Sequence, residues 1–527
     1  MGIYLNPGND GFWEAVSSKI YVDKTNLIAC TNELISTEQK FICVSRPRRF
    51  GKSMALKMLA AYYSRGCDSA SLFHGRKIEC EETFKKHLNQ YDVIYLNMQQ
   101  FLIEAESQEL TKYLEQEVLD EFLEEYAEFL QRPDMGLAAS LRKIYAKTKK
   151  KFIFLIDEWD CVMRERQTSE TLQKQYLDFL RNLLKDQPYV ALAYMTGILP
   201  VKKYGEHSAL NMFTEYSMTD QDVFEEYTGF TEAEVKELCG QFNMDFAEIS
   251  SWYDGYMFTE FQHIYNPKSV VEAMHRHKFS NYWASTEVYD ALKNYISMDF
   301  DGLREDIAQM LGGGRVRINT RSFRNDMHNF EVKDDVLTLL VHLGYLAYDS
   351  RTKEVFIPNK EIVEEFETAM SVKGWSEVMR VIKASEKLLE DTLSCNEKGV
   401  ADGLDKAHTE ISSILTYNDE SALGAAIGLA YYSARKDYML IRELPTGKGF
   451  ADIVFLPLPH TAKPAFVVEL KYDKTAAAAI QQIKDRNYTQ TLERYTGEIL
   501  LVGINYNRNS ADKPHSCIIE KVEKKDL

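Results

Sequence analysis

The sequence predicts an α/β protein with a parallel sheet near the N-terminus and a second, smaller sheet near the C-terminus. Three observations indicate this class. Apolar runs at residues 40–44, 152–156 and 189–200 have the composition of strands buried inside a parallel sheet. A helical pattern follows the first run directly. Two further strand patterns, at 449–458 and 465–473, stand close together near the C-terminus.

The composition narrows the class of protein further. With 527 residues, of which 45% are hydrophobic, the chain has room for roughly three or four domains. A net charge of −17 argues against a general binder of polyanions, so contact with nucleic acid must use a local basic surface. The eight cysteines form no C-x-x-C pair, which predicts reduced thiols in the cytoplasm. No apolar run approaches membrane-spanning length, so we expect no membrane association.

The first strand pattern leads into the tail of a phosphate-binding loop, Gly51-Lys52-Ser53. The full pattern requires a glycine where this chain has Arg46. The surrounding order of strand, tight loop and helix is nevertheless the one that such a loop needs. Lys52 would neutralise the β- and γ-phosphates, and the Ser53 hydroxyl would bind Mg²⁺. The alternative is a solvated basic turn that contains these three residues by chance.

The second strand pattern ends in two carboxylates. Asp157 follows the apolar run 152–156, at the carboxyl end where ligands bind in open α/β sheets. In a phosphate-loop ATPase this aspartate holds Mg²⁺, and Glu158 is then the base that polarises the attacking water. Both residues could instead cap the next helix. Thr196, at the end of the third pattern, could sense the γ-phosphate or be an ordinary strand-end threonine.

Four segments, at residues 21–25, 46–53, 154–160 and 196–201, resemble the predicted AAA-ATPase-like family of bacterial proteins. In that family the loop reads P-R-R-F-G-K-S without a leading glycine, so the departure at Arg46 is typical. The resemblance extends to about residue 370 and implies that ATP is bound with Mg²⁺. It implies the following nucleotide-binding residues: Arg48, Arg49, Phe50, Gly51, Lys52, Ser53, Met54 and Thr196. Positive charge from the loop arginines would lie near the phosphates.

The middle of the chain is mostly helical in pattern. Thr231 and Glu234 form a capping box before an apolar-periodic run, which predicts a helical lid on the ATPase core. Residues 334–366 follow the order helix, turn at Gly344, strand, turn, strand and helix. That order suits a winged-helix unit, which either binds DNA or serves as a packing module.

In the segment after Asp157 and Glu158, Arg181 is a candidate for an arginine finger.

The two C-terminal strand patterns carry a second possible chemistry. Side chains alternate along a strand, so Glu469 and Lys471 share one face. Asp452 and Glu469, from neighbouring strands, could hold one divalent ion through oxygen ligands. Lys471 could then orient or deprotonate a water for attack on a phosphodiester. The alternative is a half-exposed strand in which Glu469 and Lys471 are merely a surface pair.

This D…E-x-K arrangement resembles the PD-(D/E)XK nuclease superfamily, over roughly residues 395 to 520. The resemblance implies a nucleic-acid substrate, with DNA expected, and Mg²⁺ or Mn²⁺ as the metal ion. It also implies three accessory residues. Glu420 stands at the start of a helix where the fold often offers another acidic ligand. Gln482 and Tyr488 resemble the glutamine–tyrosine motif of RecB-like members.

The order of these patterns predicts five segments. They are an ATPase core at 1–210, a helical lid at 211–290, a winged-helix-like domain at 291–372, a helical connector at 373–394 and a restriction-endonuclease-like α/β domain at 395–527.

Two functions fit this organisation. In the first, ATP binding and hydrolysis gate a Mg²⁺-dependent nuclease, with a role in defence or in a mobile element by analogy of architecture. In the second, a STAND-like ATPase switch controls a C-terminal domain that binds nucleic acid or a partner without cutting. Either protein would be cytoplasmic, and either could form a homo-oligomer.

Overall fold

The computed structural model describes the chain in two compact units. One comprises Met1–Tyr282 with Ile318–Lys353, and the other Trp283–Arg317 with Glu354–Leu527. The described residues are all except the following: 1, 106–108, 131–134, 167–168, 202–209, 221–222, 262, 284–288, 299, 324–329, 371–374, 412–419, 447–448, 459–460, 462, 486–496, 508–513 and 523–527. Within the described chain, no helix is both long and apolar enough to span a membrane.

The first unit is built on a five-stranded sheet in which every neighbouring pair of strands is parallel. The strand order is β2-β3-β4-β1-β5. All residues of β1, β3 and β4 are buried, as their apolar sequences predict. The last strand, β5, lies within the segment that the sequence assigns to the lid. The strands are β1 (Phe41–Ser45), β2 (Asp92–Asn97), β3 (Phe152–Asp157), β4 (Val190–Gly197) and β5 (Thr214–Tyr216).

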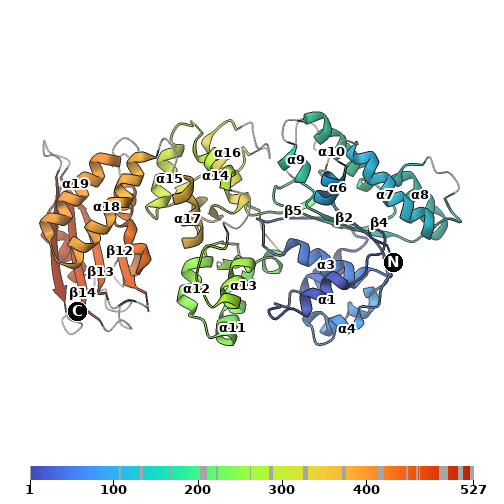
Figure 1. Ribbon diagram of the computed structural model, residues 1–527, viewed down its shortest axis with the longest axis horizontal. Coiled ribbons are helices and arrows are strands. Elements are labelled where there is room, and N and C mark those ends of the chain that lie inside the picture. Colours follow the sequence, from blue (N-terminus) through green and yellow to red (C-terminus); the bar gives the residue numbers. More distant parts are fainter. Residues whose placement is uncertain are drawn as a thin grey trace. The chain divides into compact units, whose positions relative to one another are not determined.

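Helices cover both faces of this sheet. Figure 1 shows α1, α3 and α4 on one face, and α7, α8 and α10 on the other. On the first face, Leu56 and Leu59 of α3 join Val44, Ile153 and Leu155 of the strands in one apolar core. The helices are α1 (Asp10–Val16), α2 (Asn26–Leu34), α3 (Lys52–Tyr63), α4 (Ala70–Phe73), α5 (Phe84–His87), α6 (Met98–Glu104), α7 (Leu110–Glu125), α8 (Leu137–Thr148), α9 (Cys161–Glu165) and α10 (Glu170–Leu184), with the 3₁₀ turn Lys77–Cys80.

Three helices follow the sheet in the region predicted to be the lid. The predicted capping box is present: the Thr231 hydroxyl accepts from the Glu234 amide at 3.4 Å, and the Glu234 carboxylate accepts from the Thr231 amide at 2.8 Å. The elements are β6 (Phe230–Thr231), α11 (Glu232–Phe242), α12 (Phe246–Tyr253), β7 (Ile264–Tyr265) and α13 (Pro267–Arg276), after the 3₁₀ turn Glu225–Tyr227.

The elements predicted over residues 334–366 occur in the predicted order. Gly344 ends the first helix in the left-handed region, at φ 88°, where a glycine is favoured. The elements are α16 (Lys333–Leu343), β9 (Ala347–Asp349), β10 (Glu354–Phe356) and α17 (Lys360–Ala369). The winged-helix assignment, and the choice between DNA binding and packing, stay predictions.

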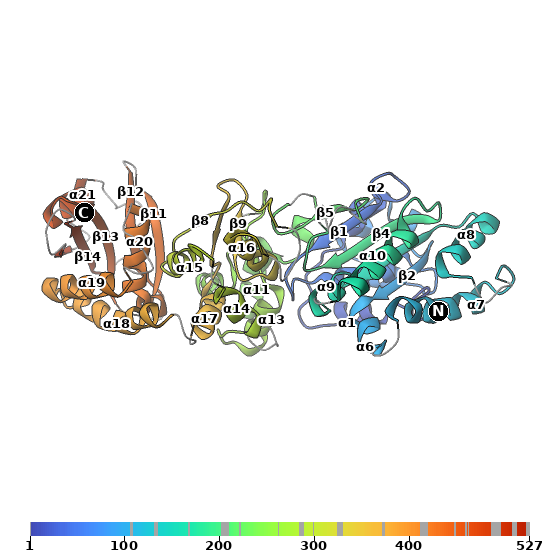
Figure 2. The same ribbon diagram turned by 90° about the horizontal axis from the view of Figure 1, so that it is seen from above.

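The second unit contains a mixed sheet with strand order β11-β12-β13-β14-β15, in which only β13 and β14 are parallel. In Figure 2, α21 lies on one side of this sheet and α18 and α19 lie on the other. The strands are β11 (Tyr438–Thr446), β12 (Gly449–Pro457), β13 (Ala465–Tyr472), β14 (Ile499–Tyr506) and β15 (His515–Val522).

The remaining elements of this unit are mostly helical, and α18 occupies the predicted connector. They are α14 (Tyr289–Ile296), α15 (Leu303–Leu311), β8 (Val316–Arg317), α18 (Ser376–Leu393), α19 (Glu397–Ile411), α20 (Glu420–Ala430), the 3₁₀ turn Tyr432–Lys436 and α21 (Ala476–Asp485). The predicted fold class is confirmed: an N-terminal parallel-sheet domain and a separate C-terminal α/β domain.

Candidate nucleotide-binding and nuclease sites

The loop between β1 and α3 has the predicted order of strand, loop and helix. Gly51 is the N-cap of α3 and has φ 85°, a backbone conformation that favours glycine. The helix begins at Lys52, so the amide groups of its first turn face the loop. Ser53 and Met54, in that first turn, are exposed. A helix N-terminus of this kind attracts phosphate through its amides and its dipole.

Lys52 is buried and bonds to the loop that precedes it. Its amine donates to the backbone carbonyl of Arg46 at 2.9 Å and to that of Pro47 at 2.8 Å. Burial lowers the pKa of Lys52 to about 8, and the nearby carboxylates of Glu158 and Asp157 oppose that shift. The Lys52 amine is therefore bonded to two carbonyls of its own loop.

The Arg46 side chain, at the position of the missing glycine, points into the protein core. It is fully buried, and its guanidinium donates to the backbone carbonyls of Ser45 at 3.0 Å and Tyr216 at 2.8 Å. The guanidinium also lies 4.7 Å from the centre of the Phe258 ring. Burial lowers the pKa of Arg46 to about 10. The Arg46 guanidinium therefore links β1 to β5 and to the segment after α12.

Two other loop side chains also contact the region after the sheet. The Phe50 ring is fully buried and packs edge-on against Tyr256, with 5.1 Å between ring centres. Arg49 has a positive φ of 69° and donates to the backbone carbonyl of Tyr282. Arg48 is half-buried. Which loop atoms meet a phosphate stays a prediction.

Asp157 and Thr196 meet at the carboxyl edge of the sheet. The Thr196 hydroxyl donates to Asp157 Oδ1 at 2.6 Å, and both side chains are buried. Strand β4 lies between β1 and β3, and Thr196 pairs in register with Val44 of β1. The strand order therefore places Thr196 between the loop after β1 and the carboxylates after β3.

Glu158 is held by a residue that sequence reasoning missed. Its carboxylate forms an ion pair with Arg164, whose Nε also lies 3.1 Å from Asp160 Oδ2. The same Asp160 oxygen accepts the backbone amides of Ile198 at 3.0 Å and Leu199 at 2.8 Å. The sequence could have indicated a role for Arg164 through the i,i+4 spacing of Asp160 and Arg164, because that spacing predicts a charge pair on a helix.

Gly197 permits the end of β4 to lie close to the segment that follows β3. A Cβ at this position would lie 2.6 Å from Trp159 Nε1 and 2.9 Å from Asp160 Oδ1. A side chain there would therefore force the segment after β3 away from the end of β4.

Arg181 lies elsewhere in the first unit. It is exposed in the last turn of α10, the helix that leads from β3 back to the start of β4. Tyr189, just before β4, donates to the backbone carbonyl of Leu183 at 2.6 Å and fixes that turn. In a parallel sheet the starts and ends of strands lie at opposite edges, so Arg181 is not among the residues gathered near Asp157.

Three of the predicted nuclease residues converge on β13 and α21. Glu469 is 1% exposed, and its Oε1 accepts from Lys471 Nζ at 2.9 Å. The same oxygen accepts from the side-chain amide of Gln482. The alternation of side chains along β13 places Glu469 and Lys471 on the face that α21 covers.

The other predicted nuclease residues are only partly described. Asp452 belongs to β12 and precedes Ile453, which pairs with Val468, the residue before Glu469. The side chain of Asp452 lies outside the described part of the structure, as does that of Glu420 in α20, and Tyr488 is outside it altogether. Among described residues, no group of three or more His, Cys, Asp or Glu side chains is placed to hold a metal ion.

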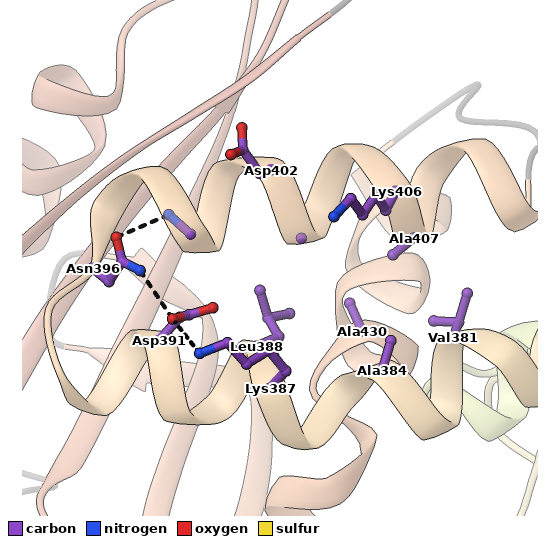
Figure 3. A pocket seen from close by; sticks show the side chains of 12 residues that line it. Val381, Ala384, Lys387, Leu388, Asp391, Asn396, Asp402, Lys406, Ala407 and Ala430 are labelled. Carbon is purple, nitrogen blue, oxygen red and sulfur yellow. Dashed lines mark hydrogen bonds and ion pairs between the residues drawn. The ribbon is translucent and has the colours of Figure 1, made fainter.

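A cavity of about 380 Å³ lies between α18 and α19 (Figure 3). Its walls include Leu388 and Ala407, with Lys387 and Lys406 among the charged side chains around it. Asp391 accepts from Lys387 at 3.0 Å on one side of it. None of the predicted site residues lines this cavity.

Two family models match the chain. Residues 15–205 match the family described as predicted AAA-ATPase, and residues 425–515 match the PD-(D/E)XK nuclease superfamily. These matches confirm the two resemblances over the residues matched, 15–205 for the ATPase and 425–515 for the nuclease.

Two individual proteins are also similar to the chain. An uncharacterized protein in the vnfD 5′ region of Azotobacter chroococcum mcd 1 is 23% identical over 513 residues, which cover 93% of each chain. The structure of the Aeropyrum pernix ORC2 protein, with ADPNP and ADP, matches 68% of this chain and 96% of its own at 10% identity and a TM-score of 0.30.

Proposed function

We propose that the protein hydrolyses ATP in its first unit, cleaves nucleic acid, with DNA expected, in its C-terminal domain, and controls cleavage through its nucleotide state. Two separate groups of side chains support this proposal. One gathers at the carboxyl edge of the parallel sheet, and the other lies on β13 and α21. The first group supplies the carboxylates and the hydroxyl that an ATPase needs. The second supplies a carboxylate and a lysine, to which Asp452 of β12 would add the second carboxylate of a nuclease.

In the ATPase reaction, Lys52 would leave the carbonyls of Arg46 and Pro47 and bind the β- and γ-phosphates. Ser53 and Asp157 supply the hard oxygen donors that Mg²⁺ prefers, and the ion would offset the charge of the phosphates. The Thr196 hydroxyl fixes the orientation of Asp157. Glu158, the next residue, would accept the proton of the attacking water.

In the nuclease reaction, Glu469 and Asp452 would bind a divalent ion, which activates a water and polarises the phosphodiester. Lys471 would orient or deprotonate that water and then offset charge on the phosphate oxygens. Gln482 would fix the Glu469 carboxylate through its amide. The single observation that carries this function is the bonding of Lys471 and Gln482 to one oxygen of the buried Glu469.

The test is cleavage of plasmid DNA and of RNA with Mg²⁺ or Mn²⁺, with and without ATP. We expect Glu469→Gln to abolish cleavage, because the amide is a poor metal ligand. The matched control is Glu498→Gln, which changes an exposed glutamate that pairs with Lys521 on the surface of the same domain. Equal cleavage by wild type and Glu469→Gln would exclude this nuclease site.

A second candidate is a nucleotide-controlled switch of the STAND type that binds nucleic acid or a partner without cutting. The contacts of Arg49 with Tyr282 and of Phe50 with Tyr256 favour it, because they join the loop to the predicted lid. This candidate predicts no cleavage under any condition, together with DNA binding that changes between ATP and ADP. A role in defence or in a mobile element rests on the pairing of the two domains alone.

A further inference from the structure

We propose that Asn505, near the carboxyl end of β14, donates a hydrogen bond to the scissile phosphate of the nucleic acid that is cut. This inference rests on the proposed nuclease function and adds a substrate contact outside the residues predicted from the sequence. The strand register, the approach of α21 and the orientation of the Asn505 amide support it.

Strand pairing places Asn505 beside the residues of the proposed nuclease site. Strands β13 and β14 are parallel, with Glu469 opposite Gly503 and Lys471 opposite Asn505. Side chains of residues paired in register point to the same face of a sheet, and neighbouring strands lie about 4.8 Å apart. The Asn505 side chain therefore lies next to that of Lys471, on the face that α21 covers.

The start of α21 leaves Asn505 at the edge of this face. A Cβ at Gly503 would lie 2.5 Å from the carbonyl oxygen of Ala476, the first residue of α21. The helix therefore begins directly over Gly503, and its next turn packs on the sheet through Ile480, which shares an apolar cluster with Leu501. Asn505 is two residues further toward the carboxyl end, about 6.6 Å along the strand, so it lies beyond the first turn of the helix.

The Asn505 amide has a fixed orientation. Its Oδ1 accepts from the backbone amide of Lys474 at 2.9 Å, and a backbone amide can only donate, so Nδ2 is directed away from Lys474. Nδ2 has no hydrogen-bond partner among the residues that the structure describes. Asn505 is 4% exposed, comparable to Glu469 at 1%, which must itself reach the metal ion. Buried amide donors are nearly always bonded, so an unpaired donor in such a site indicates a ligand.

The position of Nδ2 suits a donor to a phosphate. A phosphodiester under attack has two non-bridging oxygens on which negative charge grows in the transition state. Asp452 and Glu469 would place the metal ion at one of them, and Lys471 would act on the water. The Asn505 amide would donate to the other oxygen, and a preorganised donor of this kind contributes about 100-fold to the rate.

The first experiment separates the donor from the anchor of Lys474. Asn505→Asp keeps an oxygen for the Lys474 amide but has no N–H to donate. We expect its single-turnover rate of DNA cleavage, at saturating protein and Mg²⁺, to fall about 100-fold. If Asn505 served only to hold Lys474, this variant would cut at nearly the wild-type rate. A fall of less than about tenfold would overturn the inference.

Ser516→Asp is the matched control for the added charge. Ser516 is exposed and lies directly opposite Asn505 on β15, so its side chain is on the same face of the sheet. The variant introduces a carboxylate beside Asn505 and leaves the amide in place. Its cleavage rate should stay within about threefold of wild type. Losses of equal size in the two aspartate variants would show that charge alone causes them, and the phosphate contact would be wrong.

The second experiment uses Asn505→Ala, which lacks both the donor and the anchor. A lost phosphate contact should lower the rate at saturating Mg²⁺ about 100-fold and leave the Mg²⁺ concentration at half-maximal rate unchanged. A purely structural role would act through α21 and Gln482, which donates to Glu469, so it would raise that concentration. A near-wild-type rate at saturating Mg²⁺, with a raised midpoint, would contradict the proposed contact.

Two results separate this inference from the proposed function. If Glu469→Gln cuts DNA as fast as wild type, the nuclease site is wrong and the phosphate contact fails with it. If Glu469→Gln is inactive while Asn505→Asp and Asn505→Ala both match wild type, only the phosphate contact is wrong. Thermal unfolding shows whether each variant is folded. Should Asn505→Asp not fold, Asn505→Ala decides the matter through its rate at saturating Mg²⁺.

Discussion

Nucleotide binding should weaken as the pH rises above 8, because Lys52 then loses the proton that attracts the phosphates. In the free protein, burial lowers the pKa of Lys52 from 10.5 to about 8. In a complex the phosphates would surround the ammonium with negative charge and raise its pKa again. The nucleotide itself is fully charged above neutral pH, because a terminal phosphate has its last pKa near 6.

The size of the effect follows from that pKa. If only the protonated amine binds phosphate, the dissociation constant should increase about 15-fold between pH 8 and pH 9.5. Near pH 7 both Lys52 and the terminal phosphate are charged, so the dissociation constant should change little around that pH. The free energy of unfolding should change in the opposite sense. The unfolded chain keeps its proton up to pH 10.5 and the folded chain loses it near pH 8, so stability without nucleotide rises with pH across this window.

Isothermal titration calorimetry with ADP at pH 7, 8, 9 and 9.5, in two buffers of different ionisation enthalpy at each pH, measures the dissociation constant and the number of protons taken up. We expect uptake of about 0.9 proton per ADP at pH 9 and almost none at pH 7. Lys57→Gln changes an exposed lysine on the same helix and should keep this dependence. Equal affinities at pH 7 and pH 9.5 without proton uptake would refute the lowered pKa of Lys52.

Three substitutions test the geometry of the two sites. Thr196→Val removes the hydroxyl that bonds to Asp157. We expect ATP turnover in a steady-state assay to fall about tenfold, and ADP affinity measured by calorimetry to change little. Gly197→Ala places a Cβ against Trp159, and thermal unfolding should show a loss of about 1–3 kcal/mol. Gln482→Ala removes a donor to the Glu469 carboxylate, and DNA cleavage should fall about tenfold or more.

Matched variants control for general damage. Gly240→Ala adds a Cβ in α11 where no atom lies within 4 Å, so it should stabilise the protein slightly. Gln481→Ala changes the exposed neighbour of Gln482. The Gln481 amide donates to Asp485 in the same helix at 2.8 Å, and the variant should leave cleavage intact. If Gly197→Ala unfolds with the stability of wild type, or Gln482→Ala cuts like Gln481→Ala, the corresponding contact has no role.

Much of the fold could be predicted from the sequence because buried parallel strands appear as continuous apolar runs. Strands β1, β3 and β4 lie where such runs occur, and Asp157 lies at a strand end for the same reason. The strand β5 has only three residues and is partly exposed, so it gave no such signal. Glu469 and Lys471 could be paired because strand alternation is local.

The remaining contacts could not be predicted because their partners are distant in the chain. Arg46 bonds to a carbonyl 170 residues away, and Arg49 to one 233 residues away. A sequence pattern near the loop shows only that these side chains are basic, which suggested a role at the phosphates. The pair of Glu158 and Arg164 is local, but no sequence pattern predicts the positive φ of Glu158.

The central claim is that the nucleotide state controls nucleic-acid cleavage. The measurement that tests it most directly is the cleavage rate of Glu158→Gln with ATP, with ADP and with no nucleotide, at saturating Mg²⁺. This variant should bind ATP without hydrolysing it, so each condition holds one nucleotide state. We expect the rate with ATP to differ by about tenfold or more from the other two rates, the range of a coupling free energy of 1–3 kcal/mol. Equal rates in all three conditions would contradict the claim and leave two independent activities on one chain.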